Sequence, residues 1–251
     1  MFKPTYDYEW NMLGVYNYKR KGKLSCYFEY LNKNLDKEGD LIEAGVYRGS
    51  SLLSVALFLK ETGSSKKVYG YDSFKGFPNV YHENDSIEKF EELFQLKNIT
   101  IEHFKKIESA IRIRKLIKQN DDNGANIIST SGDFSNTSIK LLMKKIDFLG
   151  LDNIVLFDGP FNETMDSSYN KGPDKLLAGI VDCDLYISYQ TTLNFIWPKL
   201  IRGGGLYLDE YFSLKFPGGK ISVDEFLETH DGLLQKNHDD NLSFERWMLF
   251  K

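Results

Sequence analysis

The chain has 251 residues, of which 41% are hydrophobic and 27% are charged, a composition that excludes a disordered chain. Its formal net charge of −4 is not the basic balance of a nucleic-acid-binding surface, so we expect no nucleic-acid partner. Its two cysteines provide neither a disulfide framework nor a zinc knuckle, and no stretch approaches the roughly 18 apolar residues that span a bilayer. We therefore expect a cytoplasmic protein with no membrane partner.

Short apolar runs alternate with longer helical patterns from residue 40 onward, which is typical of strands and helices in a parallel α/β sheet. The expected strands are residues 40–46, 67–72, 152–158, 176–184 and 204–210. The expected helices are residues 50–61, 135–148, 189–201 and 222–230, with Ser50 or Ser51 as the N-cap of the first. Two further runs, 233–237 and 242–250, flank a turn-rich His-Asp-Asp and predict an antiparallel hairpin at the C-terminus.

Two segments do not follow this alternation. Residues 79–132 are polar, contain a charged helix-like stretch and are too long for a simple loop, so we interpret them as an inserted helical cap or lid over the strand ends. We expect residues 1–38 to be an aromatic-rich helical segment that packs over a cofactor or makes a dimer contact, and residues 39–251 to be one domain. The four histidines lie in polar stretches, and we expect most of them at the surface.

Acidic residues stand at or near the end of every expected parallel strand. They are Glu43, Asp72, Asp158, Asp182 with Asp184, and Asp209 with Glu210. Ligands of open parallel sheets bind outside the carboxyl ends of the strands. The sequence therefore predicts one site lined by carboxylates.

The first loop, "LIEAGVYRGSS", combines Glu43 with Gly45 and Gly49. The two glycines let the backbone approach a ligand closely. A dinucleotide fingerprint needs one more glycine, and the carboxylate of Glu43 would repel a diphosphate. The loop therefore favours a ligand with a positive charge and an amino-acid end, such as S-adenosylmethionine, over NAD.

The next two strand ends suit an adenosine. Asp72 is placed to accept hydrogen bonds from ribose hydroxyls, and the alternative is an ordinary turn or capping aspartate. Asp158, Gly159 and Phe161 are placed near the adenine ring, and a Gly-Pro turn with a core phenylalanine is the equally weighted alternative.

Asp182, Asp209 and Glu210 are expected to converge, because their strands should be neighbours. Three carboxylates without histidine or cysteine suit Mg²⁺ or Mn²⁺. Such an ion would hold oxygens of the acceptor and stabilise its alkoxide. The alternative is that Asp184 and Asp209 cap the elements that follow, although adjacent acids repel unless a cation lies between them.

Five segments in this order carry a family resemblance: "LIEAGVYRGSS", "VYGYDSFKGFP", "VLFDGPFNETM", "VDCDLYISYQTTLNFIWPKLIRGGGLYLDEY" and "FPGGKISVDEFLETH". Together they resemble the macrocin O-methyltransferase (TylF-type) family, over residues 39–230. The resemblance implies a Rossmann-like class I methyltransferase fold, with a mostly parallel seven-stranded sheet, helices on both faces and a C-terminal antiparallel hairpin. It also implies a Mg²⁺-dependent transfer of a methyl group from S-adenosylmethionine to a sugar hydroxyl.

The resemblance also implies residue roles. The methionine end of the cofactor would meet Glu43, Gly45, Tyr47, Gly49, Ser50 and Ser51; the ribose would meet Asp72, Ser73 and Phe74; the adenine would meet Asp158, Gly159 and Phe161. The metal ligands would be Asp182, which also borders the cofactor, Asp209 and Glu210, and the general base would be Asp182 or Asp184. One position departs from the family, whose usual Asp-Asp-Tyr is Asp209-Glu210-Tyr211 here.

Two rival functions remain open. A nicotinamide-dependent sugar oxidoreductase or epimerase would use a similar sheet, but the chain lacks the third glycine and a Tyr-x-x-x-Lys pair after the fourth strand. The other rival is a non-catalytic sugar-binding module that kept the sheet.

Overall fold

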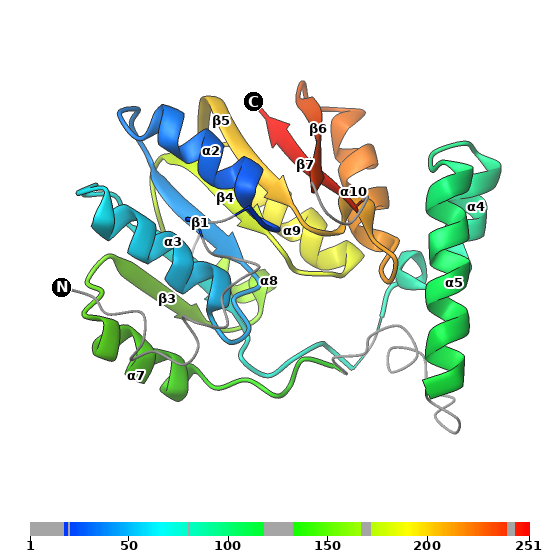
Figure 1. Ribbon diagram of the computed structural model, residues 1–251, viewed down its shortest axis with the longest axis horizontal. Helices are drawn as coiled ribbons and strands as arrows, with labels where there is room; N and C mark the ends of the chain where they lie inside the picture. The colour runs from blue at the N-terminus through cyan, green and yellow to red at the C-terminus, as the bar shows by residue number, and fades with distance from the viewer. Residues whose placement is uncertain (1–17, 20, 80, 118–132, 167–171, 240–243) are drawn as a thin grey trace.

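The computed structural model describes residues 18–19, 21–79, 81–117, 133–166, 172–239 and 244–251. Within these ranges the core is a seven-stranded sheet of order β3-β2-β1-β4-β5-β7-β6 (Figure 1). The strands are β1 Asp40–Ala44, β2 Val68–Asp72, β3 Ile154–Asp158, β4 Leu176–Val181, β5 Leu200–Leu208, β6 Leu233–Asp239 and β7 Phe244–Phe250. The first five pair in parallel, and β7 runs antiparallel to both β5 and β6. The predicted parallel sheet and terminal hairpin are confirmed.

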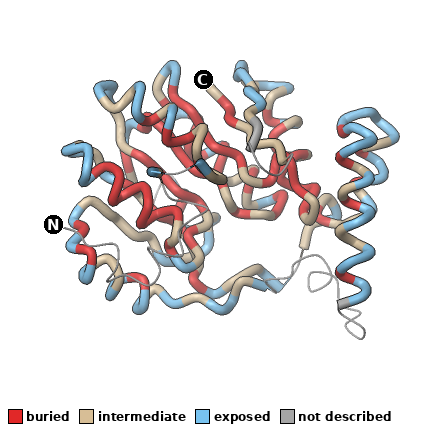
Figure 2. Tube along the Cα trace, in the orientation of Figure 1, coloured by how far each residue is buried: buried red, intermediate tan, exposed pale blue. Residues whose placement is uncertain are grey.

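Helices cover both faces of the sheet, as predicted. One face carries α2 Ser25–Asn34, α3 Ser50–Glu61 and α7 Ile139–Leu149; the other carries α8 Phe161–Thr164, α9 Tyr186–Ile196 and α10 Gly218–Leu227. Adjacent residues of β1 show the division, because Leu41 packs into the first cluster and Ile42 into the second. Figure 2 shows that the buried residues concentrate in the sheet and in the helices that pack on it.

Several predicted boundaries differ from the structure, and three of them have a clear physical reason. The N-cap of α3 is Gly49, with φ 85° and no side-chain cap, because the hydroxyl of Ser51 is turned toward Glu43 instead. The strand expected to end at residue 184 ends at Val181. Helix α9 ends at Ile196 and not at residue 201, because Pro198 has no N–H to continue the helix and the chain enters β5 at Leu200.

The described part of the inserted segment contains the 3₁₀ turn η3 Glu83–Asp85 and the helices α4 Lys89–Gln95 and α5 Ile101–Ile117. The two helices form a small apolar core of their own, made of Phe90, Leu93, Ile99 and Ile107, with Leu214 and Ile221 packed against it. The insert therefore lies against the connection between β5 and α10 (Figure 1). Residues 118–132 of the predicted cap and residues 1–17 of the predicted N-terminal segment lie outside the described residues.

Polar contacts also fix the insert to the sheet domain, among them the bond from Arg114 to the carbonyl of Leu214 at 3.0 Å. The buried Asp85 accepts a hydrogen bond from the N–H of Tyr186, the first residue of α9, at 2.7 Å. The His103 ring stacks on Phe212 with 3.9 Å between ring centroids, and its Nε2 lies 2.7 Å from the carbonyl of Ser213. The expectation of surface histidines is therefore wrong for His103, which the insert buries. Among the described helices, none has the length and apolarity needed to cross a membrane.

Candidate active site

The acids at the strand ends meet at one edge of the sheet. Asp72 and Asp158 are register partners on β2 and β3. The N–H of Asp182 donates to the carbonyl of Ala44 at 2.9 Å, and the N–H of Asp209 donates to the carbonyl of Val181 at 3.0 Å. These bonds continue the ladders of β1, β4 and β5 one residue past the strands. The carboxylates therefore emerge side by side, as predicted.

Glycine is required in the β1–α3 loop for steric reasons. Gly45 has φ 90°, and a Cβ on it would lie 1.7 Å from the carbonyl oxygen of Asp182. Gly49 has φ 85°, and its Cβ would lie 2.3 Å from a methyl carbon of Leu142. Tyr47, with φ 52°, completes the turn between them. Gly45 lets the loop pass the backbone of Asp182, whereas Gly49 is favoured by its left-handed φ, since the Leu142 side chain could move.

Glu43 is a fully buried acid whose hydrogen bonding is incomplete. Its Oε1 accepts a hydrogen bond from the hydroxyl of Ser51 at 2.5 Å, while Oε2 is buried without a hydrogen-bond partner. Burial raises the pKa of Glu43 to about 8; the bond from Ser51 and the charge of Lys23 lower it, the carboxylates of Asp182 and Asp72 raise it, and burial outweighs them all. A buried carboxylate oxygen with no donor is costly. It is therefore the best indication in the site of a ligand that brings a donor or a positive charge.

Asp72 organises the two loops beside it. One carboxylate oxygen accepts the N–H of Tyr47 and the other accepts the N–H of Phe74, both at 2.7 Å. Burial raises the pKa of Asp72, and these backbone donors oppose the rise. Ser73 is turned away from the carboxylate, toward the carbonyl of Gly76 at 3.2 Å. Each oxygen of Asp72 keeps a second lone pair, so the capping role and a bond to a ribose hydroxyl are compatible.

The third strand end is more open. Asp158 is exposed, Gly159 donates its N–H to the carbonyl of Asp72 at 3.0 Å, and Phe161 is half-buried against the apolar cluster of the α9 face. The structure thus places these residues beside Asp72. The half-buried phenylalanine matches both sequence interpretations, a core contact and a surface for a ring.

Beyond β4 and β5, three acids form a tight cluster. One carboxylate oxygen from each of Asp182, Asp184 and Glu210 lies within 4.8 Å of the others. The hydroxyl of Tyr189 donates to Glu210 Oε2 at 2.7 Å, and the N–H of Asp184 approaches the same oxygen at 3.4 Å. Burial, followed by repulsion from neighbouring acids that include Asp209, raises the pKa of Asp182 to about 6 and raises the pKa values of Asp184 and Glu210 well above their usual range. Such a cluster favours a bound cation.

Asp209, a predicted metal ligand, has a different neighbour. The Nζ of Lys23 lies 2.8 Å from Asp209 Oδ1 and 3.2 Å from Asp182 Oδ2. The hydroxyl of Tyr207 also donates to Asp209 Oδ1, at 3.1 Å. Although burial would raise it, the pKa of Asp209 is lowered, because Lys23, Glu210 and Arg246 together outweigh burial. Sequence reasoning missed Lys23, which is 159 positions from Asp182 and belongs to no motif.

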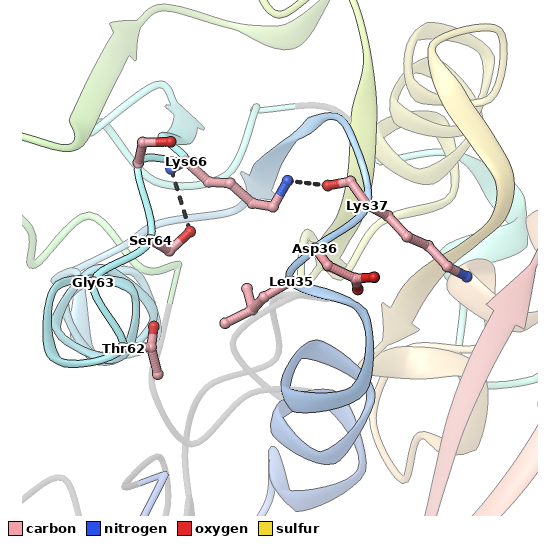
Figure 3. A pocket seen from close by; sticks show the side chains of 8 residues that line it. Leu35, Asp36, Lys37, Thr62, Gly63, Ser64 and Lys66 are labelled. Atoms are coloured by element: carbon pink, nitrogen blue, oxygen red, sulfur yellow. Dashed lines mark hydrogen bonds between the residues drawn. The ribbon is translucent and has the colours of Figure 1, made fainter.

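A separate hollow lies away from the acids. It has a volume of 440 Å³ and is lined by residues 35–37 and 62–66, which precede β1 and β2 (Figure 3). Inside it, Lys66 donates to backbone carbonyls of Lys37 and Gly39. The hollow is therefore at the amino ends of the strands, opposite the edge where the acids meet, and contains none of the predicted site residues.

Comparison with solved structures identifies the fold. The fold resembles that of the O-methyltransferase NovP, with a TM-score of 0.60 and 20% identity over 89% of this chain and 75% of that chain. It also resembles the calicheamicin methyltransferase CalS11, with a TM-score of 0.57 and 18% identity over 89% of this chain and 76% of that chain. The predicted Rossmann-like methyltransferase fold is confirmed.

The family model for macrocin-O-methyltransferase (TylF) matches residues 12–152, and the chain belongs to this family of O-methyltransferases. The match contains the Glu43 loop and Asp72 but ends before Asp182. A curated relative from Streptomyces olivaceus, 8-demethyl-8-(2,3-dimethoxy-alpha-L-rhamnosyl)-tetracenomycin-C 4'-O-methyltransferase, is 23% identical over 175 residues, which is 69% of this chain. The chain spans about half of that relative, 53% of its length.

Proposed function

We propose that the protein is an S-adenosylmethionine-dependent O-methyltransferase that requires Mg²⁺ or Mn²⁺ and acts on a hydroxyl of a sugar or a glycosylated small molecule. The names of its relatives support the acceptor class. The curated relative is named for the 4' oxygen of a rhamnosyl group, and CalS11 is described as a TDP-rhamnose 3'-O-methyltransferase. The chain itself supplies the support for the cofactor and the metal.

The observation that carries the proposal is the buried, unpartnered Oε2 of Glu43, which lies at the same sheet edge as Asp72. The amino-acid end of S-adenosylmethionine carries an ammonium group, and that group can donate to Oε2. Asp72 would then accept ribose hydroxyls with its remaining lone pairs. A buried negative charge on Glu43 is unfavourable without a partner. A cationic ligand therefore gains more binding free energy here than it would at an exposed carboxylate.

The remaining residues of the proposed methyl-donor site lie at the same edge of the sheet. They are Gly45, Tyr47, Gly49, Ser50 and Ser51 from the first loop, Ser73 and Phe74 after β2, Asp158, Gly159 and Phe161 after β3, and Asp182 after β4. Within this set, Tyr47 and Phe74 act through the hydrogen bonds that orient Asp72. Ser51 acts through its bond to Glu43.

The acids after β4 and β5 fit a divalent cation. Asp182 and Glu210 are close enough to share one ion, and Asp184 adds a third carboxylate oxygen within the same 4.8 Å. Asp209 is the fourth candidate, next to Glu210. The longer side chain of Glu210 does not remove it from the group, since its carboxylate still reaches Asp184 and Asp182. Carboxylate oxygens are the ligands that Mg²⁺ and Mn²⁺ prefer.

The chain's own residues would then carry out the proton transfer. When bound, the methyl donor supplies the methyl group and a divalent cation supplies positive charge that stabilises a developing alkoxide. A carboxylate oxygen of Asp184 accepts the proton of the acceptor hydroxyl, with Asp182 as the alternative base. Burial and Asp182 raise the pKa of Asp184, which strengthens its affinity for that proton.

The surrounding segments would complete the site. We assign residues 79–132 as a lid that covers the acceptor, and residues 1–38 as a segment that borders the methyl donor or joins two copies of the chain. The described contacts of the insert with Phe212 and Ser213 support the first assignment, because these residues lie two and three positions after Glu210. The ion pairs of Lys23 with Asp182 and Asp209 support the second.

Calorimetry with S-adenosylhomocysteine and with NAD tests the cofactor. We expect binding of S-adenosylhomocysteine and none of NAD, and we expect Glu43→Gln to weaken binding by on the order of tenfold, because a charge-assisted hydrogen bond becomes a neutral one. Glu38→Gln is the matched control, since Glu38 pairs with Lys175 in solvent. Binding of NAD alone would favour the oxidoreductase, and binding of neither compound would favour a non-catalytic module.

A further inference from the structure

Lys23 brings a positive charge of the chain itself into the acid cluster. It lies two residues before α2, and its side chain is only 13% exposed. Its Nζ contacts Asp209 Oδ1 at 2.8 Å and Asp182 Oδ2 at 3.2 Å. One ammonium group therefore joins the carboxylates that follow two neighbouring strands, β4 and β5.

These two carboxylates need a cation between them. Both are largely buried, and each raises the other's preference for a proton unless a positive charge intervenes. An ammonium group meets that need at Asp182 and Asp209, and a divalent cation held by the acid cluster would meet it through Asp182 as well. They repel each other at such distances, so they do not occupy the position together.

We propose that Lys23 is a tethered competitor of the divalent cation, and that its ammonium group leaves Asp182 and Asp209 when the cation binds. The inference rests on the metal site of the proposed function and adds a residue that sets the affinity of that site. Lys23 is thus a positioning residue, which keeps the two carboxylates together until the metal replaces it.

The attachment of Lys23 allows such an exchange. Helix α2 is held by Tyr27, Phe28 and Leu31 in the core, so the helix stays in place. The turn before it is fixed by the bond from the N–H of Gly22 to the Ser25 hydroxyl at 2.7 Å. Only the lysine side chain has to rotate. When it does, the ion pairs with Asp182 and Asp209 no longer restrain the backbone near residue 23.

Binding of Mn²⁺, followed by the electron paramagnetic resonance signal of the free ion, tests the inference without any acceptor. We expect Lys23→Met to bind Mn²⁺ at least tenfold more tightly than the unmodified protein, because the competing charge is gone. Lys23→Arg keeps a cation and should stay within threefold. Lys175→Met, which breaks the exposed pair with Glu38, is the matched control and should change nothing.

Loss of Lys23 removes the ion pair of Asp182 and leaves Asp209 with Arg246 at 4.0 Å, so folding of each variant is checked by circular dichroism. If Lys23→Met does not fold, Lys23→Gln keeps a donor, removes the charge and should show the same tightening. A second readout is hydrogen exchange at residues 21–26, which Mn²⁺ should accelerate in the unmodified protein only.

The outcomes separate the two proposals. Equal or weaker Mn²⁺ binding in both neutral variants overturns the role of Lys23 and leaves the metal site intact. Absence of Mn²⁺ binding in every protein overturns the competition and the metal part of the proposed function together. Tighter binding in the neutral variants, with the arginine and Lys175 variants unchanged, supports both.

Discussion

At the scale of single residues, Gly45 is the position where the loop and the sheet come closest. A Cβ there would lie 1.7 Å from the carbonyl oxygen of Asp182. We expect Gly45→Ala to lower the free energy of unfolding by roughly 3 kcal/mol, from the left-handed φ and the clash together. Gly63→Ala is the control, because φ is 69° there but nothing lies within 4 Å. It should cost about 1 kcal/mol, and equal costs in urea unfolding would contradict this account of the loop.

Glu43 predicts a pH dependence of stability in the ligand-free protein. Its pKa rises from 4.5 to about 8 on burial, so the folded protein holds this proton more tightly than the unfolded chain does. The stability that the protonated group contributes is complete below pH 4.5 and is lost as the pH rises through 8. Relative to Glu43→Gln, the unmodified protein should therefore lose a few kcal/mol between pH 5 and pH 9 in urea titrations. A constant difference between the two proteins would show that Glu43 is not buried as a neutral acid.

The sequence predicted that acids gather at one edge, because carboxyl ends of parallel strands share it, but it expected Asp209 where the cluster contains Asp184. It did not predict Lys23, since an ion pair between residues 159 positions apart leaves no local pattern. It also placed Asp184 in the chemistry as a base without placing it in the cluster. The left-handed φ of 60° that turns Asp184 toward Glu210 depends on tertiary contacts.

At the scale of elements, the insert is held to the sheet domain by Asp85. This buried carboxylate accepts the N–H of the first residue of α9, where α9 has no side-chain cap of its own. We expect Asp85→Ala to cost about 1 to 2 kcal/mol and to speed proteolysis within residues 83–117. Glu83→Ala, in the same 3₁₀ turn but exposed, is the control. Unchanged proteolysis in Asp85→Ala would mean that the apolar contacts of α4 and α5 suffice.

Alternation of apolar runs predicted every strand and the terminal hairpin, because period and length distinguish strands from helices. Element ends were less predictable. Serine is the usual N-cap, but here Ser51 bonds to Glu43 and Gly49 takes the cap position. The sequence also did not predict the burial of His103, since that burial depends on where the insert packs.

At the scale of the whole molecule, the strand order divides the site into two halves. β1 is flanked by β2 on one side and β4 on the other, and this is where the order reverses. Glu43, Asp72 and Asp158 belong to β1, β2 and β3, whereas Asp184 and Glu210 follow β4 and β5. The first half is proposed to hold the methyl donor, and the second to hold the cation and the acceptor hydroxyl.

This division predicts that a substitution in one half weakens binding of its own ligand and leaves binding of the other ligand nearly unchanged. Asp184→Asn should weaken Mn²⁺ binding by tenfold or more, since one of three neighbouring carboxylates loses its charge. Binding of S-adenosylhomocysteine should stay within about twofold in the same variant, because Asp184 belongs to the other half of the site. A twofold change in the dissociation constant is about 0.4 kcal/mol, against roughly 1.4 kcal/mol for a tenfold change. Equal losses of both ligands in calorimetry would show one coupled site and contradict the division.

The central claim is that carboxylates at successive strand ends hold the methyl donor and a divalent cation in one cleft. The most direct measurement is a crystal structure with S-adenosylhomocysteine and Mn²⁺. We predict nucleoside density beside Asp72 with the amino group on Glu43, and an anomalous manganese peak between Asp182 and Glu210. Nucleoside density in the hollow at the amino ends of the strands, or no manganese among these acids at saturating concentration, would contradict the claim.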